Sequence, residues 1–230
     1  MMRSVTIRAI IFSLAALSAL TPGCSDLLWS QPPDGVSRIA SQDFEEQWDG
    51  YDCRAAVDIE FSADTVIEAV HAWGSYYFGS EIPEGWNVHF YADRYDGYHH
   101  WPVGRPVYSE FVPNPDADGD GTFMCALLQP FTAKADTRYW VCFEARLDYG
   151  GEHGGVWYWS TSTPVVLDTA KWLALCGHWH DVAEIFGFRT DLAFELYTLP
   201  IPEPAATAIV VPIVLLSPLL WRKMLGPGRA

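Results

Sequence analysis

Residues 86–92 read WNVHFYA, and this stretch decides the class of fold. Successive side chains of a β-strand point to opposite faces of the sheet, so strict alternation indicates a half-buried strand. The stretch therefore predicts a strand with a buried face and a wetter face. The buried face comprises Trp86, Val88, Phe90 and Ala92, and the wetter face comprises Asn87, His89 and Tyr91.

Similar runs recur along the chain between clusters of Gly, Pro and Asp, a spacing typical of sandwiches. They cover residues 55–61, 66–73, 107–111, 123–128, 139–145, 156–159 and 192–197. Residues 170–175 and 182–186 look helical but are short. We therefore expect an all-β fold over residues 25–199, an antiparallel, jelly-roll-like β-sandwich with short helices.

The charge excludes one class of partner. The 230 residues carry 14 Lys and Arg against 29 Asp and Glu, a formal net charge of -15. Residues 25–200 hold nine of these basic residues and 28 of the acidic ones. Because nucleic acid binding needs a positive field that displaces counterions, no nucleic acid partner is expected.

The N-terminus has the order of a secretory signal. Arg3 and Arg8 lead into an apolar run over residues 9–20, and a Thr-Pro-Gly breaker follows. We expect residues 1–23 to form a signal helix that is removed on export, the alternative being a buried first helix. Cys24 comes next, so its lipidation after a lipoprotein-type cleavage stays open.

The C-terminus has the order of a membrane anchor. A nearly uncharged run over residues 205–221 precedes Arg222 and Lys223. About 17 residues at about 1.5 Å each span about 25 Å, near the lower limit for a bilayer. We expect a transmembrane helix here, with the basic residues on the cytoplasmic side. The alternative is a buried helix, although Pro212 and Pro218 would interrupt it.

Pro202, Glu203 and Pro204 stand directly before this run, in a chain that opens with a signal peptide. The combination resembles the PEP-CTERM sorting tail and covers residues 200–230. The resemblance implies an exported protein, held in the inner membrane and then delivered to the cell envelope or extracellular matrix. It also implies an exosortase-type processing enzyme as partner, which recognises the Pro-Glu-Pro triplet.

The central domain also resembles a group of secreted sandwich domains that carry such tails and have no characterised function. This resemblance implies a β-sandwich and no known catalysis. The residues that carry it are Gln42-Asp43-Phe44, Cys53, Trp73-Gly74-Ser75-Tyr76, Phe90-Tyr91-Ala92-Asp93, Tyr139-Trp140 and Leu192-Ala193-Phe194-Glu195-Leu196.

The cysteines of an exported chain are candidates for disulfides. Apart from Cys24 there are Cys53, Cys125, Cys142 and Cys176, which allow three connectivities. A hairpin about the turn at residues 132–137 would place Cys125 opposite Cys142 and leave Cys53 for Cys176. Buried free thiols are the alternative.

Two further patterns indicate ligands. Residues 114–121 read NPDADGDG, and Asp116, Asp118 and Asp120 could bind calcium, although the bidentate Glu that closes an EF-hand loop is missing. An acidic turn is the alternative, and no other cofactor is expected. Aromatic rings stack on sugar faces, so a polysaccharide site is also a candidate. Its candidate residues, expected on loops, are Tyr95, Tyr98, Trp101, Trp157 and Trp179, with core packing as the alternative.

No nucleophile elbow, metalloprotease helix or phosphate loop occurs in the sequence. We therefore expect a non-catalytic exported sandwich with a structural or adhesive role. A carbohydrate-binding module of the cell surface is the alternative, and a glycoside-acting enzyme is a third hypothesis.

Overall fold

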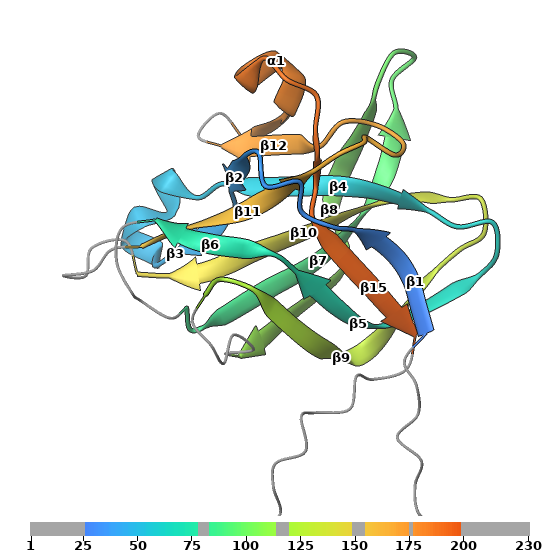
Figure 1. Ribbon diagram of the computed structural model, residues 1–230, viewed down its shortest axis with the longest axis horizontal. Coiled ribbons are helices and arrows are strands. Elements are labelled where there is room, and N and C mark those ends of the chain that lie inside the picture. Colours follow the sequence, from blue (N-terminus) through green and yellow to red (C-terminus); the bar gives the residue numbers. More distant parts are fainter. Residues whose placement is uncertain (1–25, 78–82, 114–119, 149–154, 175–176, 199–230) are drawn as a thin grey trace, which may run out of the picture.

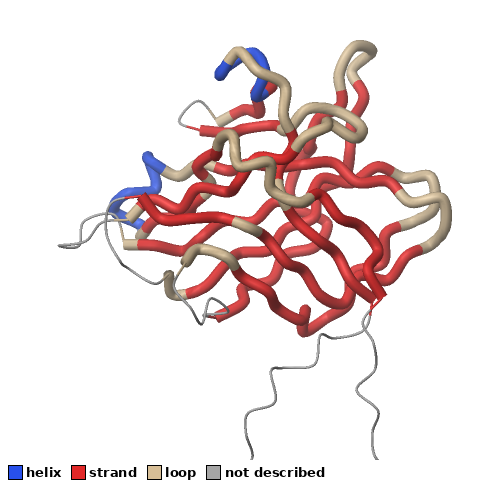
Figure 2. The backbone as a smooth tube through the Cα atoms, viewed as in Figure 1, coloured by secondary structure: helices blue, strands red, loops and turns tan. Residues whose placement is uncertain are grey.

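The computed structural model describes residues 26–77, 83–113, 120–148, 155–174 and 177–198. These residues form an all-β sandwich of mostly antiparallel sheets (Figure 2), which confirms the predicted class of fold. The expected terminal helices, over residues 1–23 and 205–221, lie outside the described residues. Within the described part of the chain, no helix is long and apolar enough to cross a membrane.

The larger sheet has the strand order β13-β12-β4-β10-β7-β8, and β3 adds to β10 in parallel (Figure 1). We call it the large sheet. Its strands are β3 (Gln42–Phe44), β4 (Arg54–Glu60), β7 (Gly85–Tyr95), β8 (His100–Pro113), β10 (Arg138–Leu147), β12 (Lys171–Ala174) and β13 (His178–Asp181).

The opposite layer consists of two smaller sheets, ordered β1-β15-β5-β9 and β14-β11-β2, with β6 also paired to β11. These strands are β1 (Asp26–Gln31), β2 (Arg38–Ala40), β5 (Thr65–Ala72), β6 (Gly74–Tyr77), β9 (Phe123–Ala133), β11 (Val156–Ser162), β14 (Asp191–Leu192) and β15 (Phe194–Thr198). The helices are the 3-10 helix η1 (Glu46–Tyr51) and α1 (Val182–Phe186). β1 and β15 lie side by side with Asp26 opposite Thr198, so both ends of the domain meet at one corner (Figure 1).

Aromatic rings fill the space between the layers. Trp86 and Phe143 of the large sheet are fully buried, and so is Trp159 of the opposite layer. Phe123 of that layer is 1% exposed. The Trp86 ring stacks on Phe123 with centroids 4.6 Å apart, and Phe143 meets Trp159 at 4.8 Å.

The predicted alternation in β7 is confirmed over residues 86–90, because Trp86, Val88 and Phe90 all have zero exposure. It is wrong for Tyr91, which was expected on the wetter face but is buried in a second apolar cluster, and for Ala92, which is only half-buried.

The large sheet is also buried on its outer face, which points away from the opposite layer. A second apolar cluster forms there from Ala56, Tyr91, Trp140 and Cys142, with Trp179 packed against it. The central strands β4 and β10 are consequently buried on both faces over most of their length. The candidate site lies on that outer face, between the β7–β8 and β12–β13 hairpins.

One helix was predicted correctly and one wrongly. Residues 182–186 form α1, which begins where the Asp181 carboxylate accepts the Ala183 N–H and ends at Gly187 with φ of 78°. Residues 171–174 are instead strand β12, paired with β4 and β13. Strand pairing in the folded chain overrides the weak helical preference of this short run.

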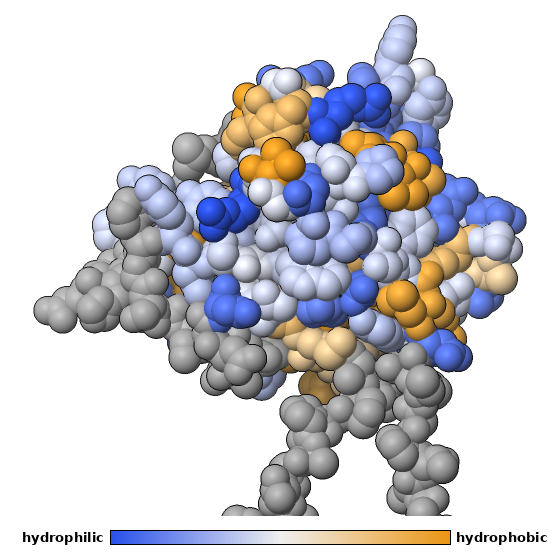
Figure 3. Space-filling model, viewed as in Figure 1, coloured by the Kyte–Doolittle hydropathy of each residue, from blue (hydrophilic) through white to orange (hydrophobic). Residues whose placement is uncertain are grey.

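Polar residues cover most of the face seen in Figure 3. An apolar patch lies near its top, at the position of α1 in Figure 1. Ile185 and Phe186 of α1 are exposed.

The close approach of β7 to β8 gives a stability prediction. A Cβ added at Gly85 would lie 2.3 Å from the backbone oxygen of Val112, so Gly85→Ala forces two strands apart. We expect a loss of about 1–3 kcal/mol in the free energy of unfolding, measured by denaturant titration. Gly50→Ala on η1 is the matched control, because nothing lies within 4 Å of its added Cβ. Equal stability of the two variants would contradict this packing.

Candidate ligand-binding groove

The candidate site is a hollow on the outer face of the large sheet, between two hairpins. The β7–β8 hairpin forms one wall and the β12–β13 hairpin forms the other, enclosing about 480 Å³. We call it the hairpin groove. Its lining residues are Arg94, Asp96, Trp101, Pro102, Val103 and Gly104 from the first hairpin, and Leu173, Gly177, His178 and Trp179 from the second.

Trp179 stands on the wall formed by β13 and is half-buried. Its ring packs against the outer cluster of the large sheet and meets Tyr91 edge to face, with centroids 5.7 Å apart. The indole is thus fixed from below by apolar contacts. Its remaining exposed surface is available to the groove.

Trp101 stands on the opposite wall, near the start of β8. Its indole N–H donates to Asp96 Oδ2 at 2.8 Å. The Asp96 carboxylate also accepts the backbone N–H groups of Tyr98 and His99, each at 2.9 Å, and so closes the hairpin turn. These hydrogen bonds, first the one from His99, lower the pKa of Asp96 to about 2, so this carboxylate is ionised at neutral pH.

The two walls meet over a buried cation. Lys171 of β12 has zero exposure, and its Nζ lies 4.7 Å from the centroid of the Trp101 ring and 5.6 Å from that of Trp140. Asp181 accepts from this ammonium at 3.0 Å, and a carboxylate oxygen of Asp168 lies 3.5 Å away. An ammonium inside a protein is tolerated when carboxylates compensate its charge in this way.

The structure brings together part of the predicted aromatic site. Trp101 and Trp179 line the same groove, but they lie on strands β8 and β13 and not on the loops that were expected. Tyr95 and Tyr98 lie on the same β7–β8 hairpin and are 58% and 88% exposed, but they do not line the hollow. The prediction for Trp157 is wrong: it lies in β11, is fully buried and donates its indole N–H to the Gly121 carbonyl at 2.8 Å.

The predicted calcium loop is described only at its end. Asp116 and Asp118 lie outside the described residues. The Asp120 carboxylate accepts the Thr122 N–H at 2.7 Å, which is the geometry of a turn. No cluster of three or more potential metal ligands occurs in the described ranges.

The predicted Cys125–Cys142 disulfide is wrong. The turn between β9 and β10 leads from one layer to the other, so these strands do not pair as a hairpin. Cys125 faces the main core and Cys142 faces the outer cluster, and both are free thiols. Burial raises the pKa of Cys125 to about 12 and that of Cys142 well above its usual value. Cys53 is buried, and its suggested partner Cys176 lies outside the described residues.

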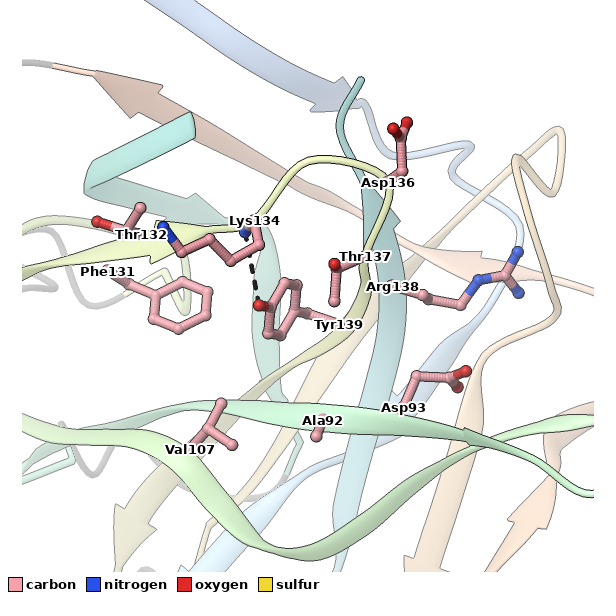
Figure 4. A pocket seen from close by; sticks show the side chains of 10 residues that line it. All are labelled: Ala92, Asp93, Val107, Phe131, Thr132, Lys134, Asp136, Thr137, Arg138 and Tyr139. Carbon is pink, nitrogen blue, oxygen red and sulfur yellow. Dashed lines mark hydrogen bonds between the residues drawn. The ribbon is translucent and has the colours of Figure 1, made fainter. Parts of the chain in front are cut away.

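A second hollow, of about 570 Å³, lies near the turn between β9 and β10 (Figure 4). The rings of Phe131 and Tyr139 lie in it, whereas the Asp136 side chain points away from them. Its cations already have partners, because Lys134 pairs with Asp64 at 2.8 Å and Arg138 pairs with Asp58 at 3.0 Å. None of the predicted ligand residues lines this hollow, which leaves the hairpin groove as the better candidate.

Sequence reasoning missed Lys171 and Asp96. Lys171 stands in an apolar run that was predicted to be helical, and nothing in the sequence shows that its ammonium is buried. Asp96 stands before Gly97, which has φ of 102°, and an Asp-Gly pair is a turn signal. That signal could have indicated the turn, but not the hydrogen bond from Trp101.

Comparison with known proteins finds no matching family model, no matching curated protein and no matching solved structure.

Two buried carboxyls, Asp58 of β4 and Asp191 of β14, have unusual pKa values. Burial raises the pKa of Asp58 and of Asp191 to about 7 each, and Asp168 adds to both shifts. A carboxyl whose pKa is higher in the folded state binds its proton more tightly there. Its stabilising effect is therefore present at low pH and is lost as pH rises from about 4 to about 7.

Asp191→Asn tests this pH dependence. Asp191 Oδ1 has no hydrogen-bond partner among the described residues, while Oδ2 accepts from Gln31 at 2.6 Å and from the Val166 N–H at 2.9 Å. We expect the wild-type melting temperature to fall between about pH 4 and pH 7, and the variant to fall less. Asp64→Asn is the control, since Asp64 is exposed and its pKa is lowered. An equally steep fall in Asp191→Asn would contradict the assignment.

Proposed function

We propose that this chain is an exported, non-catalytic protein of the cell envelope or extracellular matrix that binds a polysaccharide in the hairpin groove. The observation that carries the proposal is the pair of indoles, Trp101 and Trp179, on facing walls of one hollow. Sugar rings present apolar C–H faces and a rim of hydroxyls. Two aromatic walls suit the faces, and polar groups between them suit the rim.

The polar groups of the groove support hydroxyl recognition. Arg94 is an exposed cation, and Asp96 is an ionised acceptor held rigidly by its turn. His178 adds an imidazole from the opposite wall. Groups of both kinds can therefore donate to and accept from the hydroxyls of one sugar.

Binding without turnover is the more economical interpretation. Hydrolysis of a glycosidic bond needs two carboxyl groups placed across the scissile bond, one of them with a raised pKa. Among the described residues that line the groove, Asp96 is the only carboxylate, and its pKa is lowered. We therefore propose a binding role, and a glycoside-acting enzyme remains the third hypothesis.

The sorting part of the proposal rests on the ends of the sequence. A signal at residues 1–23 and a PEP-CTERM-like tail at residues 200–230 would export a jelly-roll-like domain and hold it for an exosortase-type enzyme. The described ends, Asp26 and Thr198, meet at one corner, and the β7–β8 hairpin reaches the opposite end of the domain in Figure 1. A membrane-held tail over residues 205–221 would thus direct the groove away from the bilayer.

The proposal predicts binding to at least one class of bacterial or algal polysaccharide. The purified full-length chain is tested against a broad panel, with calcium and again with chelator, and a dissociation constant is measured for each glycan bound. We expect Trp101→Ala and Trp179→Ala each to raise that constant about tenfold, because a central aromatic contact contributes about 1–2 kcal/mol.

Trp48→Ala is the matched control, because Trp48 is a partly buried tryptophan on η1 that does not line the groove. It should leave the dissociation constant unchanged. Failure to bind any glycan while the chain is folded, or equal binding by all three variants, would contradict the proposal. Loss of binding with chelator alone would implicate residues 116–120 instead.

A further inference from the structure

We propose that Lys171 is a positioning residue of the hairpin groove, which sets the orientation of Trp101 from behind its ring. The inference deepens the proposed function and rests on it, because it says which residue fixes one of the two stacking walls.

The ammonium of Lys171 lies against two tryptophan rings. Lys171 Nζ lies 4.7 Å from the centroid of the Trp101 ring, within the range of a cation–π contact. The same ammonium lies 5.6 Å from the ring of Trp140, which is fully buried in the outer cluster. Lys171 therefore connects a ring on the groove wall to a ring on the floor of the large sheet. A desolvated contact of this kind is stronger than one in water.

The cation itself is held in place by Asp181 and Asp168. Its two carboxylate partners each make other hydrogen bonds. Asp181 caps α1 through the Ala183 N–H at 2.8 Å, and Asp168 accepts the Thr169 N–H at 2.8 Å. Asp168 also accepts the backbone N–H of His100 at 3.5 Å, directly before Trp101 in the chain. The ammonium is thus held by elements on both sides of the groove.

The fixed cation restricts the orientation of the Trp101 ring. The indole is held at its edge by Asp96 and on one face by Lys171. Trp101 stands on the β7–β8 hairpin, whose turn residues Asp96 to His99 are exposed. Without the cation, the ring would retain the hydrogen bond to Asp96 and an edge contact with the His99 ring, with centroids 5.8 Å apart, and both partners belong to its own hairpin. A preorganised ring loses less side-chain entropy when a sugar stacks on its free face, so the contact contributes more to affinity.

The test removes the charge without leaving buried carboxylates unpaired. Lys171→Met is combined with Asp168→Asn and Asp181→Asn, and the asparagine at 181 can still cap α1. The matched control is Lys134→Met with Asp64→Asn, an exposed ion pair at the other hollow. The full-length chain is prepared with 5-fluorotryptophan, and Trp101→Phe assigns the Trp101 fluorine resonance. Three quantities are measured for each variant. They are the melting temperature, the linewidth of the Trp101 fluorine resonance without ligand, and the dissociation constant for a glycan that the wild type binds.

We expect the triple variant to remain folded, with a Trp101 resonance that is broadened or split and a dissociation constant raised about tenfold. The control should keep both wild-type values. A single narrow Trp101 line in the folded triple variant, or a dissociation constant within twofold of wild type, would overturn the inference. If the wild type binds no glycan, the proposed function fails, whereas the ligand-free linewidth still decides whether Lys171 orients Trp101.

Asp168→Asn alone is the second variant in case the triple variant does not fold. It removes the more distant carboxylate and leaves Asp181 with the ammonium at 3.0 Å. We expect a smaller broadening of the Trp101 line and a smaller rise in the dissociation constant. No change in either quantity would overturn the inference.

Discussion

Ring packing between the two layers is the constraint on which the rest of this structure depends. Trp86 of β7 stacks on Phe123 of β9, and Phe143 of β10 packs against Trp159 of β11. Large rigid rings at crystal-like density leave little freedom in the spacing of the layers. The buried indole of Trp159 also donates to the Ala193 carbonyl at 2.7 Å, which fixes the backbone between β14 and β15.

The outer face of the large sheet is constrained as well, because its central strands carry buried side chains there too. Since β4 and β10 are buried on both faces, their outward side chains need a cover, and two hairpins supply it. A cover of two hairpins leaves a hollow between them. The cost of burying Lys171 below that hollow is offset by Asp168 and Asp181, and Asp168 also accepts the His100 N–H of the β7–β8 hairpin at 3.5 Å. Stability and ligand geometry therefore depend on the same side chains.

Local sequence patterns predicted most of the strands and the sandwich class. The predictions failed where strand pairing between distant parts of the chain decides the structure. Alternation in residues 86–90 and the short helical run at residues 182–186 are local signals, and both appear in the structure as expected. Residues 171–174 were expected to be helical from a weak local preference, and pairing with β4 and β13 decided their structure. Cys125 and Cys142 are symmetric about a turn, but a turn between layers has the same local sequence as a hairpin turn.

The candidate site could be predicted only in part for a similar reason. Trp101 and Trp179 belong to separate hairpins, and the sequence cannot show that these hairpins face each other. Trp157 has aromatic neighbours much like theirs, yet β11 places it between the layers with zero exposure. Aromatic content alone does not distinguish a wall of a groove from the core.

The most direct test of the central claim is a titration of the chain with a glycan from the panel that it binds. The titration is monitored by NMR of the tryptophan indole N–H groups. Assignment by substitution separates the groove indoles from the core indoles of the same chain. The account predicts shifts for Trp101 and Trp179 and none for the buried Trp157 and Trp159. Shifts confined to tryptophans outside the hairpin groove would contradict it.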